Sequence, residues 1–257
     1  MMFAINHPLV VFVISFVAMW LAAHLGAWWS RRRPLAEGES HEMFNIVQGA
    51  TLTLLGLIIG FSFSMAISRY DQRKNYEEAE ANAIGTEYVR LDLLAPADAS
   101  KLRPLLATYL QHRITFYETT DRSQLPAITA RKNQLQLQSQ LWSAVVTPAG
   151  QQPTPITALV VAGMNDVLNS EGYTQAAWWN RIPIAAWMLL GAIAIGCNLL
   201  VGVGSGRRPA EPFFLLVLPL VVAISLMLIA DIDSPRGGLI RVSPQNLEAL
   251  KASLPAP

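Results

Sequence analysis

Four long apolar stretches, none of which contains Asp, Glu, Lys or Arg, constrain the fold of this chain more than any other feature. They cover residues 8–29, 44–68, 182–206 and 212–230. An α-helix needs about 20 apolar residues to cross about 30 Å of hydrocarbon, and each stretch comes close to or exceeds that length. We therefore expect four transmembrane helices.

The composition agrees with a membrane protein. Of the 257 residues, 52% are hydrophobic and 14% are charged, whereas roughly a quarter of the residues are charged in soluble domains. A formal net charge of +1 gives no reason to expect a nucleic-acid partner, because nucleic-acid binders carry a strongly basic face. The first apolar stretch has no basic region before it and is too long for a signal-peptide core, so we predict that it is retained.

The four stretches pair into two hairpins around a polar segment. We predict a first transmembrane hairpin at 8–68, a helical extramembrane domain at 69–181, a second transmembrane hairpin at 182–230 and a C-terminal tail at 231–257. The predicted fold is thus an all-α, multi-pass membrane protein whose domain lies between the second and third spans. The side of the membrane that holds the domain stays open, because arginines flank the spans on both sides.

Start and stop signals divide the polar segment into helices. The second span continues as a helix that ends before Pro96, and a second helix covers 98–118, where apolar residues recur at three- and four-residue spacing. A third helix contains the run LQLQSQL, whose alternation could also suit a strand, but its long helical flanks favour a helix. The run TPAGQQPTP is expected to form a loop, and Thr154, followed by a proline, to cap the next helix.

The sequence lacks the patterns on which catalysis usually depends. It has four histidines, none with a partner at metal-ligand spacing on a helix, and one cysteine, Cys197. No Gly-x-Ser-x-Gly motif or phosphate-binding loop occurs. The run GVGSG superficially suggests a dinucleotide loop, but it ends an apolar stretch and opens no helix. We expect no enzymatic activity, no cofactor and no metal site.

The second span carries two stripes of residues at four-residue spacing. The first stripe is small and allows close approach of another helix: Gly56, Gly60, Ser64 and Ser68. The second is bulky and apolar: Leu57, Phe61 and Met65. Periodicity alone favours packing of the bulky stripe against another span or lipid. In the alternative, copies of the helix surround an axis and these side chains form a constriction that excludes water.

Two segments resemble a known family. The run LLGLIIGFSFSMAISRYDQRKNYEEAEANAIG at 54–85 looks like the second transmembrane helix and following segment of the bestrophin channels, particularly the bacterial members. The run DIDSPRGGLIRVSPQNLEAL at 231–250 is similar to the closing motif of an uncharacterised bacterial group described as bestrophin-like.

The resemblance implies a ring-shaped homo-oligomer, expected to be a pentamer, with the second span lining an ion pathway. By position, the neck of the family falls on Leu57, Phe61 and Met65. The implied function is an anion-conducting channel of the bacterial inner membrane, whose partners are copies of itself, membrane lipid and inorganic ions. The alternative is a membrane-anchored interaction or stress-signalling protein without conductance. A transporter is disfavoured because no pair of interrupted spans occurs.

In a channel, the charges that follow the second span would lie at the pore exit. These residues are Arg69, Asp71, Arg73 and Lys74. They would concentrate anions if the cations dominate, but a solvated helix face with paired charges is equally compatible with the sequence. Selectivity therefore does not follow from the charges alone.

Overall fold

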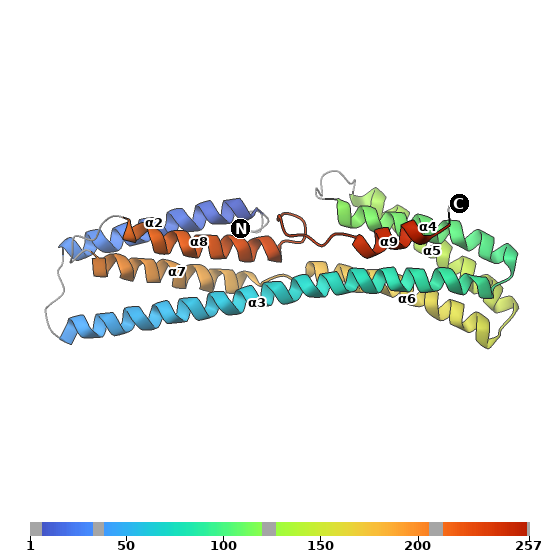
Figure 1. Ribbon diagram of the computed structural model, residues 1–257, viewed down its shortest axis with the longest axis horizontal. Coiled ribbons are helices and arrows are strands. Elements are labelled where there is room, and N and C mark those ends of the chain that lie inside the picture. The colour runs from blue at the N-terminus through green and yellow to red at the C-terminus, as the bar shows by residue number, and fades with distance from the viewer. Residues whose placement is uncertain (1–6, 33–38, 120–126, 206–212, 256–257) are drawn as a thin grey trace. The chain divides into compact units, whose positions relative to one another are not determined.

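The computed structural model describes residues 7–32, 39–119, 127–205 and 213–255 (Figure 1). Within these ranges the chain forms helices and no strand. The α-helices in chain order are α2 (Pro8–Arg32), α3 (Glu39–Arg90), α4 (Pro96–Glu118), α5 (Ala127–Gln151), α6 (Pro155–Trp179), α7 (Ile184–Ser205), α8 (Phe214–Asp233) and α9 (Gln245–Ser253). A short 3₁₀ turn, η1 (Leu91–Leu93), follows α3. The all-helical prediction is confirmed for the described residues.

The chain divides into two compact units. Unit 1 comprises Met1–Arg69 and Arg181–Arg241, and unit 2 comprises Tyr70–Asn180 and Val242–Pro257. Four stretches are long and apolar enough to span a membrane: Pro8–Arg32, Glu42–Leu93, Pro155–Ser205 and Leu215–Asp233. These contain the four predicted spans, except for a few end residues: Gly206 and Pro212 lie outside the described part, and Phe213 and Phe214 precede the fourth stretch. The connections inside each predicted hairpin also lie partly outside it, so the hairpin arrangement stays a prediction.

The helix α3 is continuous over 52 residues, which corresponds to about 78 Å at 1.5 Å per residue. No proline interrupts it, and the segment after the second span is rich in Glu, Ala, Arg and Lys, which favour helix. The helix begins in unit 1 and ends in unit 2. The junction between apolar and charged sequence near Arg69 is therefore a point along one helix and not the start of a new element.

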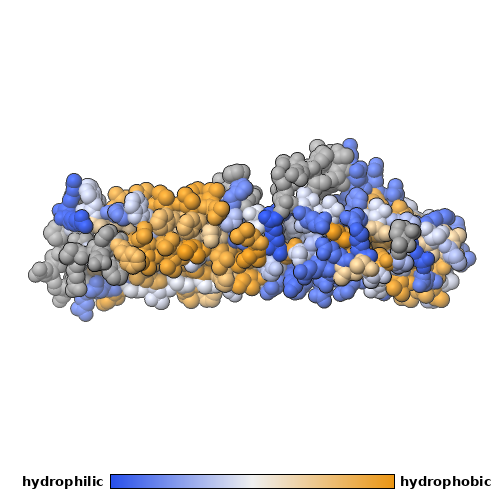
Figure 2. Space-filling model, turned by 45° about the horizontal axis from the view of Figure 1, so that its top comes forward, coloured by the Kyte–Doolittle hydropathy of each residue, from blue (hydrophilic) through white to orange (hydrophobic). Residues whose placement is uncertain are grey.

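In unit 1, α2 and α7 approach each other closely through small residues. A Cβ atom on Gly26 would collide with the backbone carbonyl of Leu199, and one on Gly202 with that of Ala23. Small residues allow this close approach. In a membrane, the lipid is as apolar as the side chains, so helices associate through close van der Waals packing. Apolar side chains cover much of the surface of these helices (Figure 2). This surface is suited to a hydrocarbon environment.

Unit 2 has a shared core beneath a largely polar surface (Figure 2). The largest fully buried side chains of this core are Ile84, Leu91, Leu102, Leu106, Tyr109, Leu110, Leu141 and Met164. Those on α4 have the three- and four-residue spacing from which the helix was predicted. The short C-terminal helix α9 belongs to the same unit and buries Leu247 completely.

The predicted loop at 147–155 is mostly wrong. The helix α5 continues through Pro148 to Gln151, and the N–H of Gln152 still donates to the carbonyl of Pro148. A proline removes one helical hydrogen bond, and here the helix continues beyond it. The cap prediction is confirmed: the Thr154 hydroxyl accepts a hydrogen bond from the N–H of Thr157, and the Thr157 hydroxyl accepts one from the N–H of Thr154.

Candidate functional site

The bulky stripe of α3 lies on the outside of the single chain. The exposed fractions are 53% for Leu57, 65% for Phe61 and 46% for Met65. The buried face of the same stretch includes Leu55 and Ala66, which are 3% and 0% exposed. The helix thus buries one face within unit 1 and leaves the face of the bulky stripe uncovered.

The small stripe of α3 is also uncovered. A Cβ atom added to Gly56 or Gly60 would meet no described atom within 4 Å, and Ser64 and Ser68 are exposed. This contrasts with Gly26 and Gly202, whose lack of a side chain is used within the chain. Among the described residues, none packs against Gly56 or Gly60 of this stripe.

The charged cluster after the second span divides into two groups. Arg69 pairs with Asp233, with Nη1 3.4 Å from Oδ1. Arg73 is only 1% exposed, and it donates from Nε to the carbonyl of Ala177 and from Nη2 to that of Asn180. Asp71 and Lys74 are exposed. Arg73 is therefore a packing residue of unit 2 in the single chain, because buried carbonyl oxygens satisfy its guanidinium.

The two aspartates of the closing motif hold different parts of the chain: Asp233 the segment before α7, and Asp231 the turn after α8. Both oxygens of Asp233 accept from the N–H of Ile182, at 3.1 and 3.2 Å, and this carboxylate also pairs with Arg181 at 3.6 Å. The carboxylate of Asp231 accepts from the N–H groups of Leu239 and Ile240, at 2.7 and 2.9 Å. The first part of the closing motif, one of the two segments that carry the resemblance, therefore has a structural role in unit 1.

Glu77 holds the start of α9. Its Oε1 accepts from the backbone N–H of Asn246 and of Leu247, each at 3.0 Å, and its Oε2 accepts from the Asn246 side chain at 2.6 Å. The first N–H groups of a helix have no partner within the helix, and a carboxylate there is favoured by the helix dipole. No local sequence pattern identifies this role, because the partners of Glu77 lie 169 and 170 residues away in the chain.

Replacement of Glu77 by alanine is expected to loosen α9 by about 1–2 kcal/mol, because the capping interaction is lost. Amide hydrogen exchange in the α9 peptide should then accelerate by about tenfold. The matched control is Glu78→Ala, which removes an exposed glutamate from the next position of α3. Equal exchange in the two variants would show that Glu77 does not hold α9.

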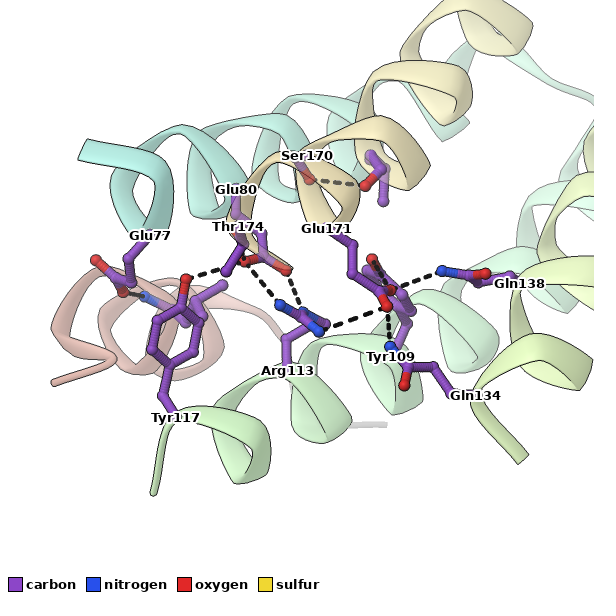
Figure 3. A network of polar contacts seen from close by, with 12 residues as sticks. Glu77, Glu80, Tyr109, Arg113, Tyr117, Gln134, Gln138, Ser170, Glu171 and Thr174 are labelled. Atoms are coloured by element: carbon purple, nitrogen blue, oxygen red, sulfur yellow. Dashed lines mark hydrogen bonds and ion pairs between the residues drawn. The ribbon is translucent and has the colours of Figure 1, made fainter. Parts of the chain in front are cut away.

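A buried ionic network occupies the centre of unit 2 (Figure 3). Arg113 on α4 lies between the carboxylates of Glu80 on α3 and Glu171 on α6. Arg113 donates from Nε and Nη2 to Glu80, which also accepts from the hydroxyls of Tyr117 at 3.3 Å and Thr174 at 3.2 Å. The network joins three helices whose residues are far apart in the sequence.

The second carboxylate of the network is satisfied by neutral donors. Glu171 accepts from the hydroxyl of Tyr109 at 3.0 Å and from the amides of Gln134 and Gln138, and its Oε1 lies 3.7 Å from Arg113 Nη1. Burial and the neighbouring carboxylate of Glu171 raise the pKa of Tyr109. The tyrosine therefore stays protonated as a donor, and every charge in the network has a partner.

Glu87 is a buried carboxylate of a different kind. It is 0% exposed, and neither of its oxygens has a hydrogen-bond partner among the described residues. Burial raises its pKa to about 8, while Arg90 acts to lower it and Asp166 to raise it. A Cβ atom on Gly163 would collide with the ends of the Glu87 and Arg90 side chains, so a larger residue here would require these side chains to move away from α6.

The described residues contain no group of three or more His, Cys, Asp or Glu side chains that could hold a metal ion. The strongest polar cluster, around Arg113, has neither a histidine nor a thiol and is fully hydrogen-bonded. Its geometry is that of a structural network. The features that remain available for function are the uncovered stripes of α3 and the exposed surfaces of the two units.

Comparison with known proteins matches this chain to a Bestrophin-like domain over residues 17–247. No curated protein matches the chain. The structural neighbours include crystal structures of a bacterial bestrophin homologue from Klebsiella pneumoniae. A tyrosine-to-alanine variant is 13% identical, with 94% of this chain and 99% of that chain covered and a TM-score of 0.66.

Two further structures of that homologue show a similar degree of likeness to this chain. A leucine-to-threonine variant is 13% identical, with 95% of this chain and 96% of that chain covered and a TM-score of 0.67. A structure solved by zinc phasing is 14% identical, with 96% and 99% covered and a TM-score of 0.64. At this identity the similarity establishes the fold. Because the family match covers most of the sequence, including the segment at 54–85 and all but the last three residues of the segment at 231–250, the chain belongs to the bestrophin-like family.

Proposed function

We propose that this protein forms a homo-oligomeric ion channel of the bacterial inner membrane, in which copies of α3 surround the pathway. Leu57, Phe61 and Met65 form its hydrophobic neck. The family and the fold support a bestrophin-like architecture. The pentameric subunit number and the conduction of anions come from the family resemblance.

The observation that carries the proposal is the uncovered face of α3. A helix that met only lipid would gain little from glycine, whereas glycine and serine at four-residue spacing allow another helix to approach closely. A Cβ atom added to Gly56 or Gly60 would meet no atom of the described residues within 4 Å. A second copy of the chain is the partner that would use this stripe, and the adjacent bulky stripe would then face a common axis.

The exposed face of α3 changes character beyond the second span. Gln72, Asn75, Asn82 and Thr86 are exposed and continue, at three- and four-residue steps, the side of the helix that holds Phe61 and Ser68. These side chains are uncharged and offer amide and hydroxyl donors to an anion. The proposed pathway would thus pass from a water-excluding neck to a polar segment.

The surfaces of the two units suggest which part of the protein lies in the membrane. We assign the membrane portion to the helices of unit 1, which carry the apolar surface, and the extramembrane domain to unit 2. These assignments correspond to the hairpins at 8–68 and 182–230 and to the domain at 69–181 that the sequence predicts. Of the predicted exit charges, we retain Asp71 and Lys74, because Arg73 is buried and Arg69 is paired.

The expected result of replacing Phe61 and Met65 together by alanine is a severalfold increase in conductance of the purified oligomer in planar bilayers, because a wider neck admits water more readily. The matched control is Val13→Ala, which shortens an exposed apolar side chain on α2 and should leave conductance unchanged. An oligomer that conducts in neither wild-type nor variant form would refute the channel. A strict monomer after mild detergent extraction and cross-linking would exclude a shared pathway.

A groove in unit 2 favours the alternative of a membrane-anchored interaction protein. It has a volume of about 540 Å³ and lies between α3 and α9, where Asn82, Gly85, Thr86 and Leu250 contribute to its walls. In a protein without conductance, this groove could receive a segment of a partner protein. A bulky substitution, Gly85→Trp, would then abolish partner capture while leaving the oligomer intact.

A further inference from the structure

A second groove, of about 350 Å³, lies in unit 1 at the end of a candidate membrane span. It is formed by the start of α2, the end of α8 and the turn that follows α8. Its apolar lining consists of Pro8, Leu9, Met227, Leu228, Leu239 and Ile240. Leu239 is 94% exposed and Leu9 is 73% exposed. Together with Leu228 and Ile240, these two leucines form an exposed apolar patch along the groove, and such a patch marks an interaction site, whereas a single exposed leucine does not.

The turn that carries Leu239 is held in place by hydrogen bonds. The Asp231 carboxylate accepts from the N–H groups of Leu239 and Ile240. Gly238 is required there because a Cβ atom would approach the carbonyl and carboxylate of Asp231 too closely. The exposure of Leu239 is thus imposed by a specific local structure.

A single cation stands at the groove. Arg241 contributes to the lining and is exposed. Its Nε donates to the carbonyl of Gly238, and among the described residues its two terminal nitrogens have no hydrogen-bond partner. The other ionisable lining residues are His7 and Asp231, and the oxygens of Asp231 are engaged by the turn. The groove therefore combines an apolar wall with an available guanidinium.

This combination selects between ligands. A dissolved anion would satisfy Arg241 but leave the leucines in water, whereas a neutral hydrocarbon would cover the leucines and leave the guanidinium without an acceptor. A phospholipid satisfies both, because its phosphate accepts charge-assisted hydrogen bonds from arginine and its acyl chain covers apolar side chains. The end of α8, a candidate span, places the groove where lipid headgroups would meet the protein.

We propose that this groove is a binding site for a membrane phospholipid, with the phosphate on Arg241 and an acyl chain along Leu9, Leu228 and Leu239. The site does not depend on whether the protein conducts ions. Lipid bound here would fasten the turn after α8 to the membrane surface.

The test is a thermal-shift titration of the full-length protein in neutral detergent. Three probes are compared: dihexanoyl phosphatidylglycerol, dihexanoylglycerol, which lacks the phosphate, and inorganic phosphate. We expect saturable stabilisation by the phospholipid only. Arg241→Gln should weaken the midpoint of that titration by about tenfold, since a charge-assisted hydrogen bond is lost, and Arg241→Lys should restore most of it. Leu239→Ser should also weaken binding.

The control variant is Lys101→Gln, which removes an exposed cation of unit 2 and should leave the titration unchanged. An Arg241→Gln titration identical to that of the wild type would overturn the proposal. Stabilisation by inorganic phosphate that matches the phospholipid would overturn it too, because the site would then take a free anion. Equal stabilisation by dihexanoylglycerol would also overturn the proposal, because it would show an apolar contact without recognition of the phosphate headgroup.

Discussion

Replacement of Arg113 by methionine is expected to destabilise unit 2 by about 3–5 kcal/mol. The substitution leaves the carboxylates of Glu80 and Glu171 buried without the only cation that pairs with them among the described residues, and breaking a buried ion pair by removing one partner costs about this much. Glu80 is 0% exposed and Glu171 is 8% exposed, so water can replace little of the lost interaction. Hydrogen exchange of the α4 and α6 peptides in the detergent-solubilised full chain should show the loss of protection.

The matched control is the exposed ion pair of Arg103 and Asp92, whose side chains are 39% and 65% exposed. Arg103→Met should cost no more than about 1 kcal/mol, because an exposed pair contributes little. A triple variant that combines Arg113→Met with Glu80→Gln and Glu171→Gln should recover most of the stability, since no buried charge remains. Equal costs for Arg113→Met and Arg103→Met would show that the network does not stabilise unit 2.

Replacement of Glu87 by methionine is expected to stabilise unit 2 at alkaline pH and to remove much of its pH dependence. In the folded protein the pKa of Glu87 is raised to about 8, from an ordinary value of 4.5. Between these values the folded state binds more protons than the unfolded state, so stability falls as pH rises and the loss is complete above pH 8. At about 1.4 kcal/mol per pH unit, the loss amounts to at most about 5 kcal/mol.

The measurement is denaturant-induced unfolding of unit 2, followed by tryptophan fluorescence of the full chain between pH 6 and pH 9. Wild type should lose stability across this window, and Glu87→Met should stay nearly level. Glu78→Met is the control, because Glu78 is exposed on the same helix and should leave the pH profile of the wild type unchanged. A Glu87→Met profile as steep as that of the wild type would mean that another group is responsible.

A substitution at Gly163 is an independent test of the contact between α6 and the Glu87 side chain. The close approach of α6 to Glu87 depends on the missing side chain at this position. A substitution to alanine would push Glu87 and Arg90 apart from α6, whereas the same substitution at Gly172, where an added Cβ meets nothing within 4 Å, should be tolerated. The comparison of the two variants therefore tests whether a glycine is needed at residue 163 for α6 to approach Glu87.

Local features of the sequence predicted the elements of the fold. The absence of charge over about 20 residues identifies a span, and a threonine before a proline identifies the start of α6. The family was also accessible, because two contiguous motifs carry it. The prediction failed at the end of α5, where proline and glycine indicated a loop but the helix continued to Gln151. A proline disfavours helix locally, yet the helix as a whole can tolerate its missing hydrogen bond.

The spacing of residues identifies the two stripes of α3. It does not predict that both stripes are exposed in the single chain. The same is true of the charged cluster after the second span, in which four neighbouring charged residues have different environments. Arg73 is buried against the carbonyls of Ala177 and Asn180, more than 100 residues away, while Lys74 is exposed. Adjacent positions on a helix point in different directions, and only the packed neighbours decide which is buried.

The sequence by itself determined that the chain is helical, that four of its stretches suit a membrane and that it resembles bestrophins, because these properties depend on residues close together in the chain. Only the tertiary structure decided the roles of Glu77, Glu80 and Glu87. Glu77 caps α9, Glu80 binds Arg113, and Glu87 is buried without a hydrogen bond from any described residue. The three lie within eleven residues of one helix and have the same chemistry. Their environments differ because their partners come from separate helices, and the free energy of a carboxylate depends on what surrounds it when it leaves water.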